Sequence, residues 1–579
     1  MDRTSPHHST SGLRAPRRPV LALAVALAAL LPAPALAGTT ERVSVGAGGV
    51  QGNGDVNGYA VISADGRYVT FSSSASTLVP GDSNGSYDIF VRDRETDTTT
   101  RVSVGPGGLQ ASGDSWEPWI SRDGRYVGYT SYASNLVASD LNGVADSFLH
   151  DRQTGVTTLI SVTPAGVQGN DESWDLNLSA DNRYAAFYSY ASNLVPGDNN
   201  GVADCFVSDL LLGTLQRVST GAGGVEGDGN SYFAELSADG RYVVFTSEAS
   251  NFAPNDVNGQ RDTFRRDLVT GALELVSVAT GGVPGDSWSN AGGWSVVSAD
   301  GRYIAFAAAA TDLVGGDTNG YIDAFVRDMT LGVTTRVSLG AFGVQGDDYS
   351  DVPSVSEDGR YVTFMSVATN LVAGDVNGTS DCFRFDRVTG ALLLVSAAPA
   401  GGTGNGQSRF AMPSADGRHI VFTSEASDLV PGDSNGTSDT FVHSDCWVTF
   451  KDYGSGLAGD GGFVPALHGT NGSCATGGYS LHIANVLGGA TGALFVGFAP
   501  ASVPLLGGNL LVSLGGPFLQ ITLPVSGPWG LPGYGALDLP GADLNALVGL
   551  KVYLQFLAAD PNAVKGVSMS NGLELDVVP

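Results

Sequence analysis

Lysine is almost missing from this 579-residue sequence, which has three, Lys451, Lys551 and Lys565, all beyond residue 450. No arginine follows Arg418, so the chain divides by composition and we expect at least two domains. Charged residues make up only 15%, and 58 acidic residues outnumber 29 basic ones. The net charge of −29 argues against nucleic acid as a partner. Beyond residue 37 no apolar run approaches the roughly 20 residues of a membrane span, so we expect no transmembrane segment in the mature chain.

Residues 1–37 have the features of a secretory signal peptide. Three arginines within residues 14–18 precede an apolar run at residues 20–31, and residues 35–37 offer a small-residue cleavage site. We therefore expect an exported protein, located in the periplasm, at the cell surface or outside the cell. Four arginines and one aspartate lie in the signal, so its removal takes the formal charge to −32.

A repeat of about 58 residues organises the chain from residue 38 to residue 445. Its clearest mark is the turn Asp-Gly-Arg-Tyr. This turn starts at Asp65, Asp123, Asp239, Asp300 and Asp358, with variants at Asp181 and Asp416. Successive turns lie 58 residues apart, except for one interval of 61. Each unit holds four short strand-forming segments between turn residues, which is typical of a propeller blade.

The outermost strands indicate how the ring closes. Seven segments have the sequence expected of the outermost strand of a blade. The first, residues 42–45, precedes blade one, and blade seven ends without an outermost strand of its own. Pairing residues 42–45 with blade seven closes the ring and removes two exposed strand edges. The sequence therefore predicts an all-β protein with a seven-bladed β-propeller closed by an N-terminal strand.

Three recurring motifs resemble the TolB-type propellers, which are built from WD40-like repeats called PD40. The motifs are Ser-x-Asp-Gly-Arg-Tyr at residues 63–68, Val-Pro-Gly-Asp-Ser-Asn-Gly at 79–85 and Asp-x-Phe-Val-Arg-Asp at 88–93. The resemblance covers residues 38–445 and implies the propeller fold. Similar propellers serve as protein-binding platforms, accessory domains of peptidases and occasionally polysaccharide lyases, so the resemblance leaves the function open.

Residues 446–579 differ in composition from the repeats. They are rich in glycine and nearly uncharged, and short apolar runs alternate with turns, which predicts a smaller β-sandwich domain. The segments at 453–456 and 566–574 resemble a C-terminal domain of secreted bacterial proteins, a resemblance that implies export and no particular activity. Cys446 and Cys474 flank the start of this domain and are the natural disulfide pair in an oxidising compartment.

The other two cysteines, Cys205 and Cys382, occupy the same repeat position three blades apart. This separation is too large for a disulfide, so we predict two buried free thiols. No residue is predicted to be catalytic. The Gly-x-Ser-x-Gly pattern at 81–85 and 432–436 does not indicate a nucleophile, because the serine position varies freely among the repeats. The five histidines beyond the signal form no cluster with metal-ligand spacing.

The most repeated chemistry is the motif Asp-x-Asn-Gly-x-x-Asp, present once in every blade. Its carboxylates and amide can converge as oxygen ligands around a tight glycine turn, as Ca²⁺ prefers. The alternative is a set of Asx turns that hold a long loop. The candidate calcium ligands are Asp82, Asn84, Asp88, Asp140, Asn142, Asp146, Asp198, Asn200, Asp204, Asp256, Asn258, Asp262, Asp317, Asn319, Asp323, Asp375, Asn377, Asp381, Asp433, Asn435 and Asp439.

A ligand is expected at the mouth of the central channel. Because strands alternate in direction, the loop after strand two and the crossing from strand four to the next blade open on one face, which we call the loop face. Aromatic and acidic residues start several inner strands there, and can stack on sugars or receive a cationic peptide. The alternative is that the aromatic rings pack blade against blade. The candidate ligand-binding residues are Trp116, Glu117, Trp174, Asp175, Tyr232 and Glu235.

The opposite face, which we call the turn face, carries the short turns. There we predict ion pairs within blades, such as Arg67 with Asp93 and Arg125 with Asp151. The leading hypothesis is an exported, non-enzymatic, monomeric propeller that binds a protein, peptide or glycan through its acidic loop face, with Ca²⁺ as the one candidate cofactor. One alternative is a polysaccharide-active, lyase-like enzyme with its site at the channel mouth. Another is a structural envelope or surface protein.

Overall fold

The computed structural model describes residues 38–138, 140–253 and 258–445, and beyond them the backbone of strands between residues 447 and 578. One compact unit spans Thr40–Ser444, and a second takes in Asp445–Pro579. The signal segment at 1–37, Cys446 and Cys474 lie outside the described residues, so the signal and the disulfide stay predictions. In the part of the chain that is described, no helix is long and apolar enough to cross a membrane.

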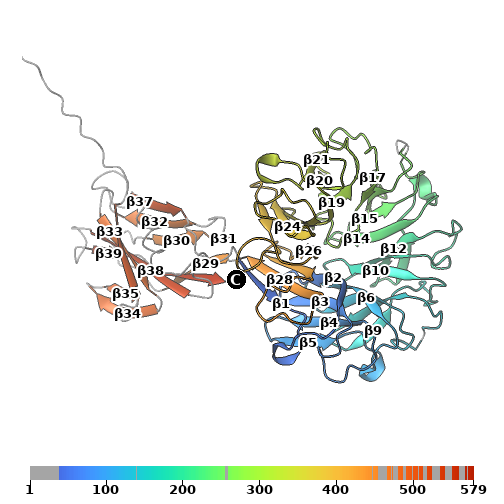
Figure 1. Cartoon of the computed structure of the whole chain (residues 1–579), viewed down its shortest axis with the longest axis horizontal. Helices are drawn as coiled ribbons and strands as arrows, with labels where there is room; N and C mark the ends of the chain where they lie inside the picture. The colour runs from blue at the N-terminus through green and yellow to red at the C-terminus, as the bar shows by residue number, and fades with distance from the viewer. Residues whose placement is uncertain are drawn as a thin grey trace, which may run out of the picture. The chain divides into compact units, whose positions relative to one another are not determined.

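The first unit is a ring of seven four-stranded antiparallel sheets (Figure 1). From the channel outward, blade one contains β2 (Val56–Ile62), β3 (Tyr68–Ser73), β4 (Asp88–Asp93) and β5 (Thr98–Arg101). Blade two contains β6 (Ser115–Ile120), β7 (Tyr126–Ser131), β8 (Asp146–Asp151) and β9 (Val156–Leu159). Blade three contains β10 (Ser173–Leu178), β11 (Tyr184–Ser189), β12 (Asp204–Asp209) and β13 (Thr214–Arg217). Blade four contains β14 (Ser231–Leu236), β15 (Tyr242–Ser247), β16 (Asp262–Asp267) and β17 (Leu273–Leu275). Blades five and six contain β18 (Ser289–Asn290), β19 (Tyr303–Ala308), β20 (Asp323–Asp328), β21 (Val333–Arg336), then β22 (Ser350–Val355), β23 (Tyr361–Ser366), β24 (Asp381–Asp386) and β25 (Leu392–Leu394).

Blade seven confirms the predicted closure of the ring. It consists of β26 (Ser408–Pro413), β27 (His419–Ser424), β28 (Asp439–Asp445) and the N-terminal β1 (Gly38–Arg42), which pairs with β28. The predicted closing segment, residues 42–45, starts where β1 ends. Val43 still donates its N–H to the Thr440 carbonyl at 2.8 Å, and Val45 turns away to bridge Gln51. The seven-bladed propeller is therefore confirmed, with a shift in the bounds of its outer strands.

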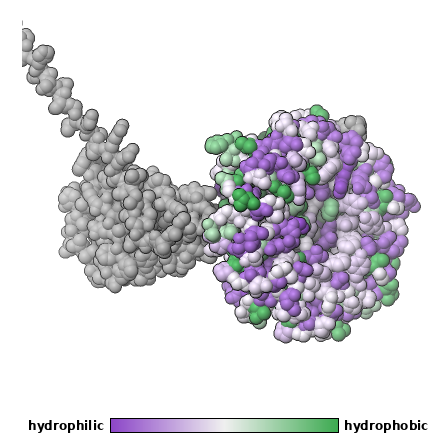
Figure 2. Space-filling model, in the orientation of Figure 1, coloured by the Kyte–Doolittle hydropathy of each residue, from purple (hydrophilic) through white to green (hydrophobic). Residues whose placement is uncertain are grey.

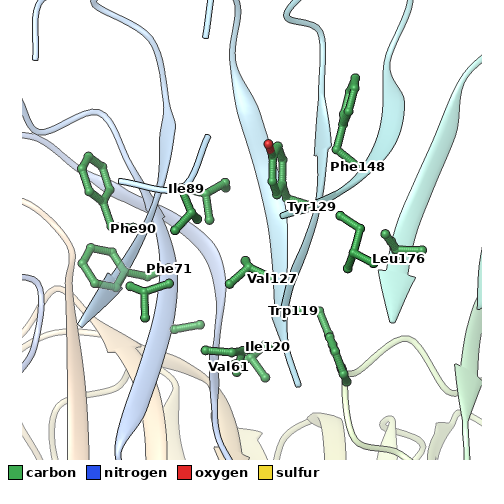
Figure 3. Packing of buried hydrophobic residues seen from close by; sticks show 14 of the residues in the cluster. Val61, Phe71, Ile89, Phe90, Trp119, Ile120, Val127, Tyr129, Phe148 and Leu176 are labelled. Carbon is green, nitrogen blue, oxygen red and sulfur yellow. The ribbon is translucent and has the colours of Figure 1, made fainter. Parts of the chain in front are cut away.

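Each blade is held by a pair of buried aromatic rings on its second and third strands. In blade one Phe71 and Phe90 stack with centroids 5.9 Å apart, and in blade two Tyr129 and Phe148 do the same (Figure 3). All four are fully buried because the sheets also pack against their neighbours. Fully burying a phenylalanine contributes roughly 2–3 kcal/mol, so the repeated pairs supply much of the stability of the ring.

The Ser-x-Asp-Gly-Arg-Tyr motif forms the turn between strands one and two. In blade one the Ser63 hydroxyl donates to Asp65 at 2.6 Å, and Asp65 accepts the N–H of Arg67 at 3.0 Å. The glycine between them, Gly66, has a φ of 75°, and an added Cβ would collide with the ring of His419 in blade seven. The predicted Arg67–Asp93 and Arg125–Asp151 ion pairs are confirmed, at 2.8 and 2.7 Å.

Short 3-10 helices lie in four of the crossings between blades: η1 (Ala47–Gly49), η2 (Pro106–Gly108), η3 (Ala222–Gly224) and η4 (Ala341–Gly343).

In the second unit, one sheet has the order β31-β29-β40-β38-β33-β36, with β39 beside β38, and smaller sheets have the orders β30-β32-β37 and β34-β35. These strands are β29 (Trp447–Tyr453), β30 (Ala466–Thr470), β31 (Gly472–Ser473), β32 (Ser480–Val486), β33 (Thr491–Gly497), β34 (Pro500–Leu505), β35 (Gly508–Val512), β36 (Phe518–Pro524), β37 (Gly535–Pro540), β38 (Lys551–Ala559), β39 (Val567–Met569) and β40 (Gly572–Val578). The β-sandwich stays a prediction.

Candidate functional site

Bulges interrupt the inner strands where they line the channel. In blade two the ladder between β6 and β7 shifts between Trp116 and Trp119, and similar shifts occur in five other blades. Glu117 and Asp175 lie at these bulges with φ values of 52° and 59°. A left-handed conformation in a residue other than glycine costs about 1–3 kcal/mol. Bulges re-aim side chains and are common beside functional sites, which directs attention to the channel.

Three carboxyl groups from successive blades line one small cavity in the channel. Glu117, Asp175 and Glu235 surround a space of about 30 Å³, which is enough for a water molecule or two but not for a sugar ring. Asp175 and Glu235 are buried. Loss of solvent raises the pKa of both Glu117 and Asp175, and the neighbouring charge of Glu117 adds to the rise at Asp175. Burial also raises the pKa of Glu235 to about 8. These groups therefore hold protons at a pH where exposed carboxyls are ionised.

Aromatic rings fill the channel beside these carboxyl groups. Tyr59 contacts Phe410 with centroids 4.3 Å apart, and Trp294 at 6.3 Å with perpendicular planes. The Tyr59 hydroxyl donates to the Gly292 carbonyl at 2.9 Å. Burial and the nearby Asp175 raise the Tyr59 pKa, so its hydroxyl stays protonated. The rings keep the carboxyl groups apart from bulk water.

A second group of rings, the aromatic band, extends across blades two to four. It consists of Trp116, Tyr132, Trp174, Tyr188, Tyr190, Tyr232 and Phe233. Trp116 and Trp174 stack between blades, 6.5 Å apart and 5° from parallel, and Tyr132 lies edge-on to both. Tyr188 contacts Tyr190, Tyr232 and Phe233. Tyr132 and Tyr190 are each 39% exposed. The band thus packs blade against blade and also offers ring surface to solvent.

The structure brings the predicted ligand-binding residues into two neighbouring groups. Glu117, Asp175 and Glu235 share the channel cavity, and Trp116, Trp174 and Tyr232 belong to the aromatic band. Sequence reasoning missed the channel rings Tyr59, Trp294 and Phe410. One signal was present: the 61-residue interval precedes blade five, where β18 is only two residues long. The chain that follows this short strand brings Trp294 into the channel.

A groove of about 440 Å³ opens on the loop face between blades seven and one. It is lined by polar and aromatic side chains, including Asp55, Asn57, Tyr87, Arg409, Phe410 and Glu425. Phe410 also contacts Tyr59, so the groove adjoins the channel rings. The groove is large enough for several side chains of an extended ligand, in contrast to the cavity between the carboxyl groups.

The Asp-x-Asn-Gly-x-x-Asp loops contain the Asx turns considered above. In blade one the Asn84 side-chain oxygen accepts the N–H of Ser86 at 3.3 Å, while its Nδ2 donates to Asp88 at 2.8 Å. Asp88 is fully buried and also accepts the Ser103 hydroxyl. The same bond from asparagine to the second aspartate occurs in the other six blades. The loops are therefore tied to the third strand of each blade by their own side chains.

A guanidinium lies between the two aspartates in alternate blades. Arg101 Nη1 is 3.0 Å from Asp82 Oδ1 and 3.2 Å from Asp88 Oδ2. The equivalent arginines of blades three, five and seven make the same two contacts at 3.1–3.6 Å; these are Arg217, Arg336 and Arg42. In these blades a protein cation already stands where the motif would hold Ca²⁺.

In blade two an amide takes the place of the guanidinium. Leu159 stands at the arginine position, and Gln168 donates to Asp140 at 2.9 Å and to Asp146 at 2.7 Å. Within the residues that the structure describes, no group of three or more histidine, cysteine, aspartate or glutamate side chains is arranged to hold a metal. Asp256 of blade four lies outside those residues. Calcium binding therefore stays a hypothesis. The group that lies between the two aspartates differs from blade to blade.

Replacing Arg217 by Leu should lower the melting temperature by several degrees at pH 8. Arg217 Nη1 lies within 3.2 Å of Asp198, Asp204 and Glu226, so its loss leaves three carboxylates facing one another. Burial and Asp204 already raise the pKa of Asp198 to about 6. The drop should be smaller at pH 5, where Asp198 takes up a proton. Differential scanning fluorimetry measures both, with Arg217→Lys as the charge-retaining control, and equal drops at the two pH values would contradict this electrostatic explanation.

The described cysteines and histidines lie away from the channel mouth. Cys205 and Cys382 are buried and unpaired, as predicted. His150 and His443 lie inside blades on the third strands, and burial lowers their pKa values to about 4 and about 3. Both rings are therefore neutral at physiological pH. Acid–base chemistry at the channel mouth falls to the carboxyl groups.

The seven four-stranded blades place the first unit among the β-propellers. No protein-family model matches the chain, and no curated protein sequence matches it. Among solved structures, it is similar to a protein described as TolB from Agrobacterium tumefaciens (15% identity, TM-score 0.33, 60% of this chain and 95% of that one). It is also similar to TolB from Acinetobacter baumannii (14%, 0.30, 69% and 81%) and to an acylaminoacyl peptidase from Pyrococcus horikoshii (10%, 0.41, 75% and 60%). At these identities the likeness concerns the fold alone, and the strand topology of this chain carries the assignment.

Proposed function

We propose that this protein is an exported, non-enzymatic β-propeller that binds a basic segment of a protein or peptide at the loop-face mouth of its channel. The observation that carries the proposal is the partly exposed aromatic band, whose rings in two blades are joined by the carboxylate of Glu172. Lysine and arginine side chains are attracted to the faces of aromatic rings and to carboxylates. Neutral glycans, which can also stack on aromatic rings, are the competing ligand class.

The charge around the aromatic band supports a cationic ligand. Glu172 accepts the Tyr132 hydroxyl at 3.0 Å and the Trp174 indole N–H at 3.3 Å, so one carboxylate joins the rings of two blades. The net charge, −29 for the whole sequence and −32 from residue 38 onward, would draw a basic partner toward the protein at low salt. On the face drawn in Figure 2, hydrophobic residues are scattered among hydrophilic ones. Recognition is therefore expected to depend on charge and ring stacking.

The test is binding of fluorescent peptides rich in lysine and arginine to the chain from residue 38 onward, beside neutral oligosaccharides. We expect the basic peptides to bind, with an affinity that falls as salt is added. Replacing Trp116 and Trp174 together by Ala should weaken binding at least tenfold. Tyr321→Ala, at an exposed tyrosine of blade five, is the control and should change little. Preferential binding of the oligosaccharides would overturn the choice of ligand class, and binding of neither would favour the structural role.

One observation favours the enzyme alternative. Glu235, with its pKa raised to about 8, is suited to proton transfer at neutral pH, and the pKa values of Glu117 and Asp175 beside it are also raised. The size of the cavities opposes it. The space among the three carboxyl groups is about 30 Å³, and the second cavity that Glu235 lines, with Arg122 and Glu357, is about 80 Å³, both far below the roughly 300–1,000 Å³ of ligand pockets. Incubation with anionic and neutral polysaccharides should therefore yield no shortened or unsaturated products. Products that disappear in Glu235→Gln would establish the enzyme instead.

A further inference from the structure

Blade six lacks both protein donors that join the two aspartates of the Asp-x-Asn-Gly-x-x-Asp loop elsewhere. Leu394 lies opposite Phe383, the position that Arg101 takes opposite Phe90 in blade one. Thr403 bridges Ala397 where, in blade two, Gln168 bridges Val162. Blade six therefore has neither the guanidinium of blades one, three, five and seven nor the amide of blade two. Its side chains at these two positions carry no N–H donor.

The aspartates of blade six keep their positions. Asp381 is fully buried and accepts the Ser396 hydroxyl at 2.7 Å and the Asn377 amide at 2.8 Å, as its counterparts do in other blades. Asp375 is only 8% exposed, and its Oδ1 is buried without a hydrogen-bond partner. In blades one and two this Oδ1 is the atom that meets the arginine or the glutamine. The unpartnered oxygen therefore faces the position of the missing donor.

Two further oxygen atoms of the same loop are buried without a hydrogen-bond partner, namely the hydroxyls of Thr379 and Ser380. Like-charged neighbours add to the cost of this arrangement. Asp375 and Asp381 bring two buried carboxyl groups together with no arginine between them, and buried charges require a partner of opposite sign.

We propose that blade six binds a hard divalent cation, Ca²⁺, between Asp375 and Asp381. In blade one a single nitrogen atom lies within 3.2 Å of both carboxylates, so one small cation can contact both in the same loop frame. Ca²⁺ takes carboxylate, hydroxyl and water oxygens at about 2.3–2.6 Å in flexible geometry, whereas Mg²⁺ demands a stricter octahedron. The site is independent of the ligand proposed for the channel mouth, which is built from other residues.

Blade four carries the same two replacements, Leu275 and Pro284, at the arginine and glutamine positions. Its first aspartate, Asp256, lies outside the described residues, and blade six alone is the proposed site. This sequence pattern still matters for the experiment, because the total number of bound ions can exceed one. The decisive quantity is the change in that number when blade six alone is altered.

Isothermal titration calorimetry of the chain from residue 38 onward, stripped with a chelator, measures Ca²⁺ binding at pH 7. Leu394→Arg restores the donor found in alternate blades, and should lower the Ca²⁺ stoichiometry by one while raising the melting temperature of the metal-free protein. The matched control is Leu159→Arg in blade two, where Gln168 already joins the aspartates; arginine and glutamine act together in this way in blade seven. That control should leave the stoichiometry unchanged.

A stoichiometry that is the same in Leu394→Arg and in the parent chain would overturn the inference. So would equal thermal shifts with Ca²⁺ and Mg²⁺, which general screening explains. If Ca²⁺ raises the melting temperature of the parent chain no more than that of Leu394→Arg at pH 7, the cation site in blade six is excluded. Should Leu394→Arg fail to fold, Asp375→Asn decides, because it removes one carboxylate ligand and should also lower the stoichiometry by one.

Discussion

Deleting residues 38–45 should abolish the cooperative folding of the propeller. This segment contains β1, the outer strand of blade seven, and its partner β28 comes from the far end of the ring. Val43, at 1% exposed, leaves the core, and the N–H of Val43 no longer reaches the Thr440 carbonyl. The deletion also exposes a long edge of β28, and such an edge is a template for pairing with other chains.

The expected result is a chain that aggregates, or that melts over a broad range far below the parent. Size-exclusion chromatography and calorimetry distinguish the two outcomes. The matched control is Arg42→Leu, which keeps β1 but removes the guanidinium between Asp433 and Asp439. Gln51 still donates to both aspartates, at 2.6 and 2.9 Å, so this variant should lose only a few degrees. A deleted chain that melts at the temperature of the parent would show that the ring does not depend on closure by β1.

The sequence was sufficient to predict the ring because its turns depend on local chemistry. The turn at Asp65 needs a serine, an aspartate and a residue that tolerates positive φ within six positions, so its period is visible without any structure. Closure followed from counting strands. The predicted bounds of the outer strands differ from the observed ones. The apolar residues near Val45 resemble part of a strand in the sequence, but in the structure they turn into the crossing between blades.

The channel could not be predicted in the same way. Bulges place Glu117 and Asp175 beside Glu235 through pairing irregularities that have no common residue type, and Tyr59 meets Trp294 and Phe410 from distant blades. The alternation of arginine and leucine at the loop aspartates is different. The sequence contains this alternation, at Arg101, Leu159 and Arg217 for example. Only the structure shows which carboxylates the arginines contact, and therefore what the leucines replace.

Replacing Glu235 by Gln should remove much of the loss of stability that we expect of this protein between pH 5 and pH 9. The ordinary pKa of glutamate, about 4.5, applies to the unfolded chain, and burial raises it to about 8 in the folded protein. Below pH 4.5 both states hold the proton. As the pH rises toward 8, only the unfolded chain releases it, so folding becomes less favourable by an amount on the order of 5 kcal/mol.

Glutamine has the same shape and keeps the oxygen that accepts the Ser295 N–H at 3.3 Å, but it does not titrate. Glu235→Gln should therefore melt several degrees above the parent at pH 8 and close to it at pH 4.5. The raised pKa values of Glu117 and Asp175 bias stability in the same direction in both proteins, so the difference between the two melting curves isolates Glu235. Glu248→Gln, at an exposed position in blade four, is the control and should follow the parent at every pH. Parallel curves for the parent and Glu235→Gln would mean that water reaches Glu235 in the folded protein, and the buried proton inferred for the channel would then be absent.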